Sequence, residues 1–281
     1  MMYDDGVLRR LQLEQLDVLK KIDELCRANG IEYFLDSGTA LGAVRHRGFI
    51  PWDDDVDIVM PRSDFERFSK IVDQELRKEF RFILPEELPN DAFFDCIPRI
   101  VYMNSRLKHE NAETAYYGNM SHRISLDIFL LDNVAESKTA HKKNVYLLKM
   151  FYAMLMGHRY KIDYKKYSFM QKLVIGFFSK IGKLFAVPNL MKRYEKIAQK
   201  ENSKESEKAF ISNYTINEIG CVFEKEWYEK DSVGIIDGCE FSIPKGYDGI
   251  LTQLYGDYMT PPPEQERVTM HCGASEEICI W

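Results

Sequence analysis

The sequence predicts a mixed α/β protein, with one small sheet flanked by helices and an added helical region. Three observations predict this class. In the first half, apolar residues at helical spacing alternate with short apolar runs that glycine or proline closes. Between Lys138 and Lys200 lysines and tyrosines become frequent, and a helical apolar stripe appears. The 281 residues are 45% hydrophobic, which is enough for a sizeable core.

The first expected element is an amphipathic helix of about five turns, with apolar residues at three- and four-residue spacing from Leu8 to Cys26. Asn29-Gly30 supplies its stop signal. The apolar run 31–35 predicts a strand. Ser37-Gly38-Thr39 then turns the chain into a short helix that ends at Gly48.

The next elements continue this alternation of strand and helix. Residues 56–60 predict a second strand, which Pro61 closes, and a helix follows from Ser63. Further strands are predicted at 81–84, 97–103 and 124–130. The first half is therefore mixed α/β, without an internal repeat or a long low-complexity linker.

Charge, the first residues and the cysteines exclude several classes of protein. With 38 basic and 44 acidic residues the formal charge is −6, so a nucleic-acid partner is not expected. The start MMYDDGVLRR has acids where a signal peptide carries basic residues, so we expect a cytoplasmic protein. Six cysteines lie far apart without a CxxC pair, which favours reduced thiols over a zinc site.

The stretch PWDDDVDI, residues 51–58, concentrates four carboxylates directly before an apolar strand. If 56–60 is extended, Asp55 and Asp57 point the same way, because side chains alternate along a strand. Two carboxylates on one face are hard oxygen ligands. They predict a magnesium site, with Mn²⁺ as the alternative ion, because magnesium is commonly held by one or two carboxylates plus water and substrate phosphate.

The same acids also allow a calcium-binding loop or a surface turn without a metal. Asp53, Asp55 and Asp57 match positions 1, 3 and 5 of an EF-hand, but Ile58 stands where that loop needs glycine and Asp64 where it needs glutamate. The EF-hand interpretation therefore fails. An acidic surface turn without a metal remains the simpler alternative.

The residues just upstream predict a phosphate site. Ser37-Gly38-Thr39 ends a strand and opens a helix, so free backbone N–H groups at the helix start can receive a phosphate. Arg45, with Arg47 as the weaker candidate, adds cationic donors. A Gly-Thr step alone usually indicates only a turn. The paired acids that follow make a phosphate site the stronger interpretation here.

One stretch of the sequence resembles the signature of the LicD family of bacterial phosphocholine transferases: LDSGTALGAVRHRGFIPWDDDVDIVMPRSDFERF. That family has a nucleotidyltransferase-like fold and is related to the fukutin group. The resemblance places Gly38 and Thr39 at its strand-to-helix turn and Asp55 and Asp57 at its paired acids. Its third acid matches Asp127, in ISLDIFLLD. The segment FSIPKGYDGILTQLYGDYMTPPP also resembles the family's C-terminal part.

The resemblance implies a magnesium-dependent transfer of a phospho-alcohol, most simply phosphocholine, from a CDP-activated donor to a glycan hydroxyl. Asp55, Asp57 and Asp127 would be the catalytic and metal-binding residues, with Asp127 as metal ligand or proton acceptor. Gly38, Thr39, Arg45 and Arg47 would contact the donor. The acceptor would be a cell-surface glycan, such as lipopolysaccharide, teichoic acid or capsule, or its lipid-linked precursor.

The resemblance also suggests three regions. Residues 1–135 would form the catalytic core, 136–210 a helical insertion, and 211–281 a segment that returns to the core. In the middle, a helical stripe that includes Met170, Leu173 and Phe177 has two interpretations. The helix packs on the core or on a second subunit, or 165–187 meets anionic lipid at the inner face of the plasma membrane.

Aromatic and histidine side chains give weaker indications. A choline head would need aromatic partners, for which Tyr116, Tyr117, Tyr255 and Tyr258 are candidates. Trp52 is either a packing residue or a base-stacking surface. Five histidines show no metal-ligand spacing with one another: His109, His122, His141, His158 and His271. Arg99 and Arg123 are candidates for holding site residues in place, or are members of structural ion pairs.

Two rival functions stay open. A nucleotidyltransferase proper would join a nucleotide to a phosphosugar or a protein and release pyrophosphate. A non-catalytic relative would bind nucleotide or glycan, although the presence of all three acids counts against it. Within the favoured class, the donor could carry glycerol or ribitol in place of choline.

Overall fold

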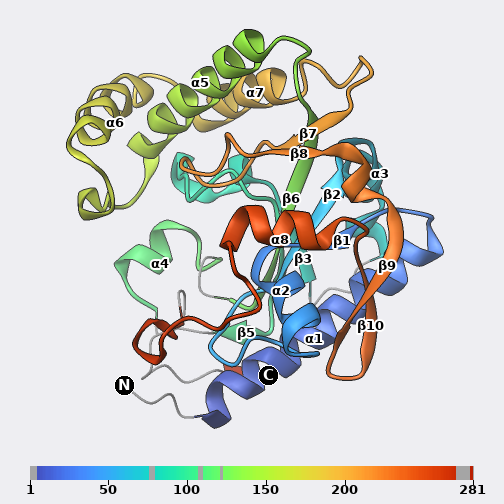
Figure 1. The fold of residues 1–281 in the computed structure, drawn as a ribbon. Helices are drawn as coiled ribbons and strands as arrows, with labels where there is room; N and C mark the ends of the chain where they lie inside the picture. Colours follow the sequence, from blue (N-terminus) through green and yellow to red (C-terminus); the bar gives the residue numbers. More distant parts are fainter. Residues whose placement is uncertain (1–4, 76–79, 107–109, 121–122, 270–278, 281) are drawn as a thin grey trace.

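A computed structural model describes residues 5–75, 80–106, 110–120, 123–269 and 279–280 and confirms the predicted class (Figure 1). Within them, the main sheet has the order β1-β2-β6-β4-β3, with β7 paired to β6 and β8 to β7. Among the strands that the structure describes, only β2 and β6 pair in parallel. The strands of the main sheet are β1 (Phe34–Leu35), β2 (Asp57–Pro61), β3 (Phe80–Ile83), β4 (Arg99–Tyr102), β6 (Ser125–Asn133), β7 (Lys208–Ile211) and β8 (Val222–Glu224).

Two small antiparallel pairs and the helices complete the described fold. The pairs are β9 (Lys230–Ile236) with β10 (Cys239–Pro244), and β5 (Ser105–Arg106) with β11 (Cys279–Ile280). The α-helices are α1 (Asp5–Ala28), α2 (Ser37–Arg45), α3 (Arg62–Glu75), α4 (Ala112–Tyr116), α5 (Lys138–Leu155), α6 (Phe169–Gly182), α7 (Val187–Ala198) and α8 (Tyr247–Tyr255). Short 3₁₀ turns are η1 (Pro85–Glu87), η2 (Pro89–Asp91), η3 (Met156–His158), η4 (Tyr164–Lys166), η5 (Lys225–Tyr228) and η6 (Glu264–Glu266).

The predicted elements of the first half occur in the predicted order. Helix α1 ends at Ala28, and Gly30 follows with a φ of 60°, a conformation that glycine adopts without steric cost. The first predicted strand is shorter than 31–35, because only Phe34 and Leu35 pair with β2. Helix α2 ends at Arg45, three residues before Gly48.

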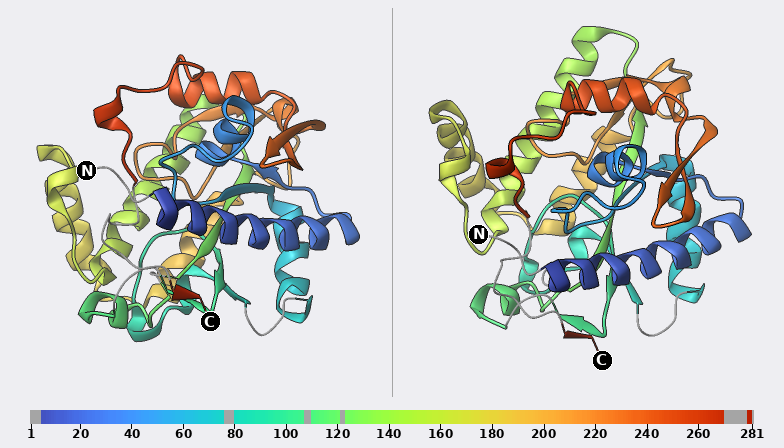
Figure 2. Two further views of the ribbon diagram at one scale, coloured as in Figure 1. Left: turned by 90° about the horizontal axis from the view of Figure 1, so that it is seen from below. Right: turned by 60° about the horizontal axis from the view of Figure 1, so that its bottom comes forward.

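Strand β6 shows how the sheet is covered on both faces. Leu126, Ile128 and Leu130 belong to one apolar cluster with α1, α2 and α3. Phe129 and Leu131 point to the opposite face and pack with residues of β7, β8 and α8. This alternation follows from the two-residue repeat of a strand. Figure 2 shows α1 lying along one side of the sheet.

Helices α5, α6 and α7 form a third apolar cluster, together with Phe93 and Cys96 from the loop before β4 (Figure 1). Strand β7 runs across residue 210, where the expected helical insertion ends, and continues the main sheet. The proposed three-way division of the chain stays a prediction.

Helix α6 packs on the core with only part of its apolar residues. Met170, Leu173 and Phe177 of the predicted apolar stripe are exposed, whereas Phe178 and Ile181 of the same helix are partly buried against the cluster that includes α5 and α7. The fully buried residues of α6 are Ile175, Ser179 and Gly182. Among the described helices, none is both long and apolar enough to cross a bilayer.

A buried ion-pair network joins the sheet to the helical region. Arg62, at the start of α3, donates from Nε and Nη2 to the two carboxylate oxygens of Asp132 on β6, at 2.9 and 2.6 Å. Its Nη1 donates to Glu195 of α7 at 2.7 Å. The side chains of Arg62 and Asp132 are 7% and 0% exposed. Asn202 also donates to Asp132, and Ser212 also accepts from Arg62. Because Asp132 is shielded from water, loss of Arg62 would leave its charge buried without an ion-pair partner.

Candidate active site

The strand-to-helix turn predicted around Gly38 is present between β1 and α2. Asp36 ends the strand, and its N–H donates to the Asp57 carbonyl at 3.0 Å. Ser37 has a φ of 47°, so the backbone turns sharply where the helix opens. The first N–H groups of a helix have no intrahelical acceptor. The start of α2 therefore offers donors beside the first residue of β2.

The side chain of Thr39 has a structural role. Its buried hydroxyl oxygen accepts a hydrogen bond from the backbone N–H of Asp57 at 2.9 Å. This bond ties the first turn of α2 to the start of β2. Thr39 thereby fixes the position of Asp57 through its backbone.

Asp57 and Asp127 are brought side by side by the sheet. They are directly paired in the parallel ladder of β2 and β6, and the Asp127 N–H donates to the Val56 carbonyl at 2.9 Å. Paired residues of neighbouring strands project from the same face of a sheet. Two acids that lie 70 positions apart in the sequence thus meet where both strands begin to pair.

The loop before β2 adds further carboxylates. Among the described residues, Asp53, Asp54 and Asp55 form a group whose ligand oxygens all lie within 4.8 Å of one another. A Cβ atom at Gly38 would lie 2.8 Å from Oδ2 of Asp53. Only glycine leaves room for this carboxylate at the start of α2. The turn and the acid cluster are therefore parts of one site.

Burial and mutual repulsion dominate the electrostatics of these acids. Burial raises the pKa of Asp57 well above its ordinary value, and the carboxylates of Asp55 and Asp127 raise it further. The pKa of Asp53 is raised by burial and then by Asp55. Two buried oxygens, Oδ2 of Asp53 and Oδ1 of Asp36, have no hydrogen-bond partner. A bound cation would offset the repulsion between the carboxylates and would give the unpaired oxygens a partner.

Arg99 is the cation that reaches this group from β4. Its Nη2 donates to Asp127 at 2.8 Å, and both of its Nη atoms donate to Asp95 at 2.8 Å. Burial raises the pKa of Asp127, and Arg99 opposes that rise. Arg123 instead donates to backbone carbonyls, including those of Met103 and Ser105. Of these two arginines, Arg99 therefore contacts a site carboxylate, whereas Arg123 holds the backbone of a loop.

The two candidate phosphate-binding arginines lie in different surroundings. Nη1 of Arg45 donates to the Tyr258 carbonyl at 2.5 Å, and burial followed by the charge of Arg267 lowers the pKa of Arg45. Arg267 in turn stacks over Trp52, with 5.2 Å between the guanidinium carbon and the ring centroid. Arg47 is exposed and lines a hollow of about 320 Å³ beside β9.

Of the four candidate tyrosines, Tyr255 is electrostatically coupled to the acids. Its side chain is 45% exposed, and partial burial, followed by the carboxylates of Asp36 and Asp57, raises its pKa. The Tyr258 hydroxyl donates to Asp248 at 2.7 Å. Tyr116 and Tyr117 pack edge to face with each other, with 5.2 Å between their ring centroids.

Sequence reasoning missed Asp36 and Tyr214. The Tyr214 hydroxyl donates to Oδ2 of Asp36 at 2.6 Å, and burial raises the pKa of Asp36 to about 6. The position of Asp36 directly before the Ser37-Gly38-Thr39 turn could have singled it out. Tyr214 lies in a loop after β7, and no local pattern marks it.

The histidines and cysteines of the described residues lie in ordinary structural surroundings. Nδ1 of His158 lies 3.2 Å from Asp91, and His141 packs against Phe210. His109, His122 and His271 fall outside the described residues. Four cysteines are free thiols: Cys26, Cys96, Cys221 and Cys239.

The metal-free protein should gain stability from Asp36→Asn, and the gain should grow with pH. The folded pKa of Asp36 is about 6, whereas an unfolded aspartate titrates near 4. The folded state therefore loses stability as pH rises from about 4 to 6, by about 3 kcal/mol. In urea unfolding with EDTA, the difference in unfolding free energy between Asp36→Asn and the parent should grow by about that amount.

The exposed Asp163→Asn serves as the control for this titration, because its side chain lies outside the cluster. A difference for Asp36→Asn that stays constant between about pH 4 and pH 7 would contradict the assigned shift.

Comparison with known proteins adds an independent observation. Residues 30–96 match the family described as LicD/FKTN/FKRP, nucleotidyltransferase domain. The chain is 27% identical to the lipopolysaccharide cholinephosphotransferase LicD of Haemophilus influenzae, over 94% of this chain and 96% of that protein. It is 47% identical to an uncharacterized protein of Rickettsia typhi, over 24% of this chain and 21% of that protein.

The family match confirms the resemblance inferred from the sequence motifs. It covers the turn at Gly38 and the whole acid stretch, and the third acid, Asp127, lies beyond it. The alignment with the Haemophilus influenzae protein extends over nearly the full chain. The family match therefore includes the segment that the structure folds into the turn at Gly38 and the acid cluster.

Proposed function

We propose that this chain, whose residues 30–96 match the LicD/FKTN/FKRP nucleotidyltransferase domain, is a phosphotransferase. The proposed reaction moves a phospho-alcohol, most simply phosphocholine, from a CDP-activated donor to a glycan hydroxyl. The observation that carries the proposal is the pairing of Asp57 with Asp127 in the β2–β6 ladder, next to the loop whose close carboxylates include Asp55. The name of the Haemophilus influenzae relative supports phosphocholine as the group and lipopolysaccharide as the kind of acceptor.

The acid cluster fits a divalent cation. Two of its buried carboxylate oxygens have no hydrogen-bond partner, and its members raise one another's pKa values. In the proposal Asp55 and Asp57 hold Mg²⁺, or Mn²⁺ in its place, and Asp127 completes the site. Asp53 is a fourth carboxylate within reach. The bound ion would neutralise charge on the donor phosphates, which is the main requirement of phosphoryl transfer.

The residues of the chain then have separate tasks. The N–H groups at the start of α2 receive a phosphate of the donor, and Arg45 adds a cationic donor. The acceptor oxygen forms a bond to the phosphorus of the phospho-alcohol while the bond from that phosphorus to CMP breaks. In the proposal Asp127, which accepts a hydrogen bond from Arg99, would also accept the proton of the attacking hydroxyl. Arg47 would need to turn from its hollow beside β9 to reach the same phosphates.

The acceptor and location follow from the same proposal. A glycan under assembly on a lipid carrier would bring the protein to the inner face of the plasma membrane. A nucleotidyltransferase acting on a phosphosugar or a protein is the second candidate, because the matched domain is of that class.

The products distinguish these reactions. Purified protein is offered CDP-choline, CDP-glycerol or CDP-ribitol with Mg²⁺ and a lipopolysaccharide acceptor, and CMP and pyrophosphate are measured. We expect acceptor-dependent CMP release with CDP-choline, and its loss in EDTA. Release of pyrophosphate would favour the nucleotidyltransferase, and turnover that persists in EDTA would contradict the metal assignment.

A further inference from the structure

The helical region has a charge opposite to that of the whole chain. Between residues 137 and 194 the sequence contains 13 lysines and arginines and a single acid, Asp163. The whole chain has 38 basic and 44 acidic residues. We call residues 137–194 the basic helical region. An acidic protein that concentrates positive charge in one segment has a surface suited to an anionic partner.

Helix α6 is held in this region by close backbone contacts. A Cβ atom at Gly182 would lie 1.9 Å from the carbonyl oxygen of Met154, and one at Gly157 would lie 2.2 Å from that of Ser179. These contacts seat the face with Ile175, Ser179 and Gly182 against α5 and η3. The side of α6 that faces outward is therefore fixed.

The outward side of α6 is apolar. Phe169, Leu173 and Phe177 are 73%, 55% and 62% exposed, and Leu184 just after the helix is 78% exposed. Isolated exposed apolar side chains are normal on a protein surface. Here several follow one face of a single helix, and lysines adjoin them. Such a face needs an apolar partner that also tolerates positive charge.

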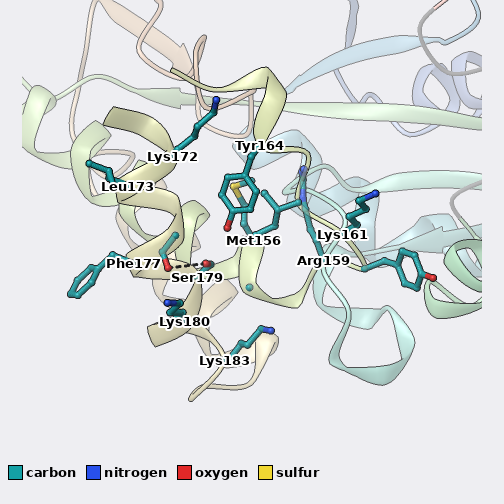
Figure 3. Close-up of a pocket in the computed structure, with 14 residues that line it drawn as sticks. Met156, Arg159, Lys161, Tyr164, Lys172, Leu173, Phe177, Ser179, Lys180 and Lys183 are labelled. Atoms are coloured by element: carbon teal, nitrogen blue, oxygen red, sulfur yellow. Dashed lines mark hydrogen bonds between the residues drawn. The ribbon is translucent and has the colours of Figure 1, made fainter. Parts of the chain in front are cut away.

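A hollow of about 820 Å³ lies beside this face, between α6 and the segment after η3 (Figure 3). Its lining includes four exposed lysines, and among the described contacts no ion pair joins any of them to an acid. They are Lys161, Lys172, Lys180 and Lys183. Arg159 also lines the hollow, and its buried Nε has no hydrogen-bond partner. The hollow therefore offers unneutralised donors to an anion.

We propose that the basic helical region docks on a membrane that contains anionic phospholipids. The outward face of α6 enters the headgroup boundary, and the hollow beside it receives lipid phosphate. Each lysine near such a surface strengthens the electrostatic attraction, and buried apolar area adds to it. Charge complementarity therefore favours an anionic membrane as the partner of this face.

A second copy of the chain is a poorer occupant. A symmetric contact through α6 would place the same surface patch on both sides. Lys172, Lys180 and Lys183 would then face their own counterparts, and like charges across an interface repel. An anionic membrane covers the apolar residues without that cost.

Vesicle binding tests the proposal without measuring transfer, so it can fail while the proposed function stands. The full chain is sedimented with vesicles of phosphatidylcholine alone or mixed with phosphatidylglycerol. We expect binding to the mixed vesicles, weakened by salt. Lys172→Glu/Lys180→Glu/Lys183→Glu should lower the affinity by about 100-fold or more, and Leu173→Ser/Phe177→Ser by about 10-fold or more.

Matched controls come from exposed residues elsewhere on the chain. Arg10→Glu/Lys70→Glu/Lys230→Glu changes the same net charge, and Leu13→Ser/Val233→Ser removes the same kind of apolar side chain. Neither control should change binding by more than about twofold. Equal binding to both vesicle types, or equal losses in controls and α6 variants, would overturn the proposal. So would a dimer that Leu173→Ser/Phe177→Ser disrupts in a protein that binds no vesicles.

Discussion

Asp57→Asn is expected to abolish CMP release while raising the melting temperature of the metal-free protein. A metal ion contributes several kcal/mol to charge stabilisation in the transition state, so loss of a ligand should cost about 100-fold or more in rate. The folded protein is destabilised by the Asp57 carboxylate, because burial and the neighbouring acids raise its pKa. Asparagine carries no charge and removes that cost. CMP release and thermal unfolding in EDTA measure the two effects.

Asp231→Asn is the matched control for this substitution, since Asp231 is exposed on β9 and lies outside the acid cluster. It should change neither rate nor melting temperature. A lower melting temperature for Asp57→Asn would show that the carboxylate stabilises the fold. Undiminished CMP release in that variant would remove Asp57 from the metal site.

Arg62→Ala should destabilise the protein by about 3–5 kcal/mol, because it leaves Asp132 buried without its ion-pair partner. Glu195 of α7 loses its partner in the same variant, so the contact between the sheet and the helical region also weakens. Urea unfolding at neutral pH, followed by circular dichroism, measures the change in unfolding free energy.

Arg67→Ala provides the comparison within the same helix. Arg67 pairs with Asp64 three residues away, and its side chain is 53% exposed. Exposed pairs of this kind contribute at most about 1 kcal/mol. An equally small loss of unfolding free energy in both variants would contradict this prediction, because the Arg62 ion pairs would then contribute no more than an exposed pair.

Local periodicity predicted most elements of the first half because those elements carry their own signals. Helix α1 has an apolar face at helical spacing and a stop signal, and its bounds lie close to the expected ones. Strand β6 was expected from an apolar run, and it forms the centre of the sheet. Such patterns survive into the fold because the same side chains make the core.

The composition of the acid site was only partly predictable. Asp55, Asp57 and Asp127 were singled out, and the ladder of β2 and β6 brings the last two together. Asp36 depends on Tyr214, which lies 178 residues further along the chain. A contact of that sequence separation leaves no local pattern.

Asp53 illustrates a second kind of limit. The sequence suggests a role for Asp53 only in an EF-hand loop, and Ile58 and Asp64 exclude such a loop. Its closeness to Gly38 arises from the turn of the backbone before β2, and single-sequence patterns do not report such geometry.

Helix α6 shows that a pattern can predict a helix without fixing which of its faces is buried. The apolar stripe left both a packed and a lipid-facing interpretation open, and the buried face contains Ser179 and Gly182, which a hydrophobic pattern does not detect. Small residues allow two backbones to approach closely, and the bulky residues remain outside.

The most direct test of the account is a calorimetric titration of the EDTA-treated, desalted protein with Mn²⁺, compared with Asp57→Asn. The account predicts saturable binding that Mg²⁺ competes for and that Asp57→Asn loses. Equal binding by both proteins, or no binding by either, would contradict the claim that these acids hold a divalent cation beside the start of α2.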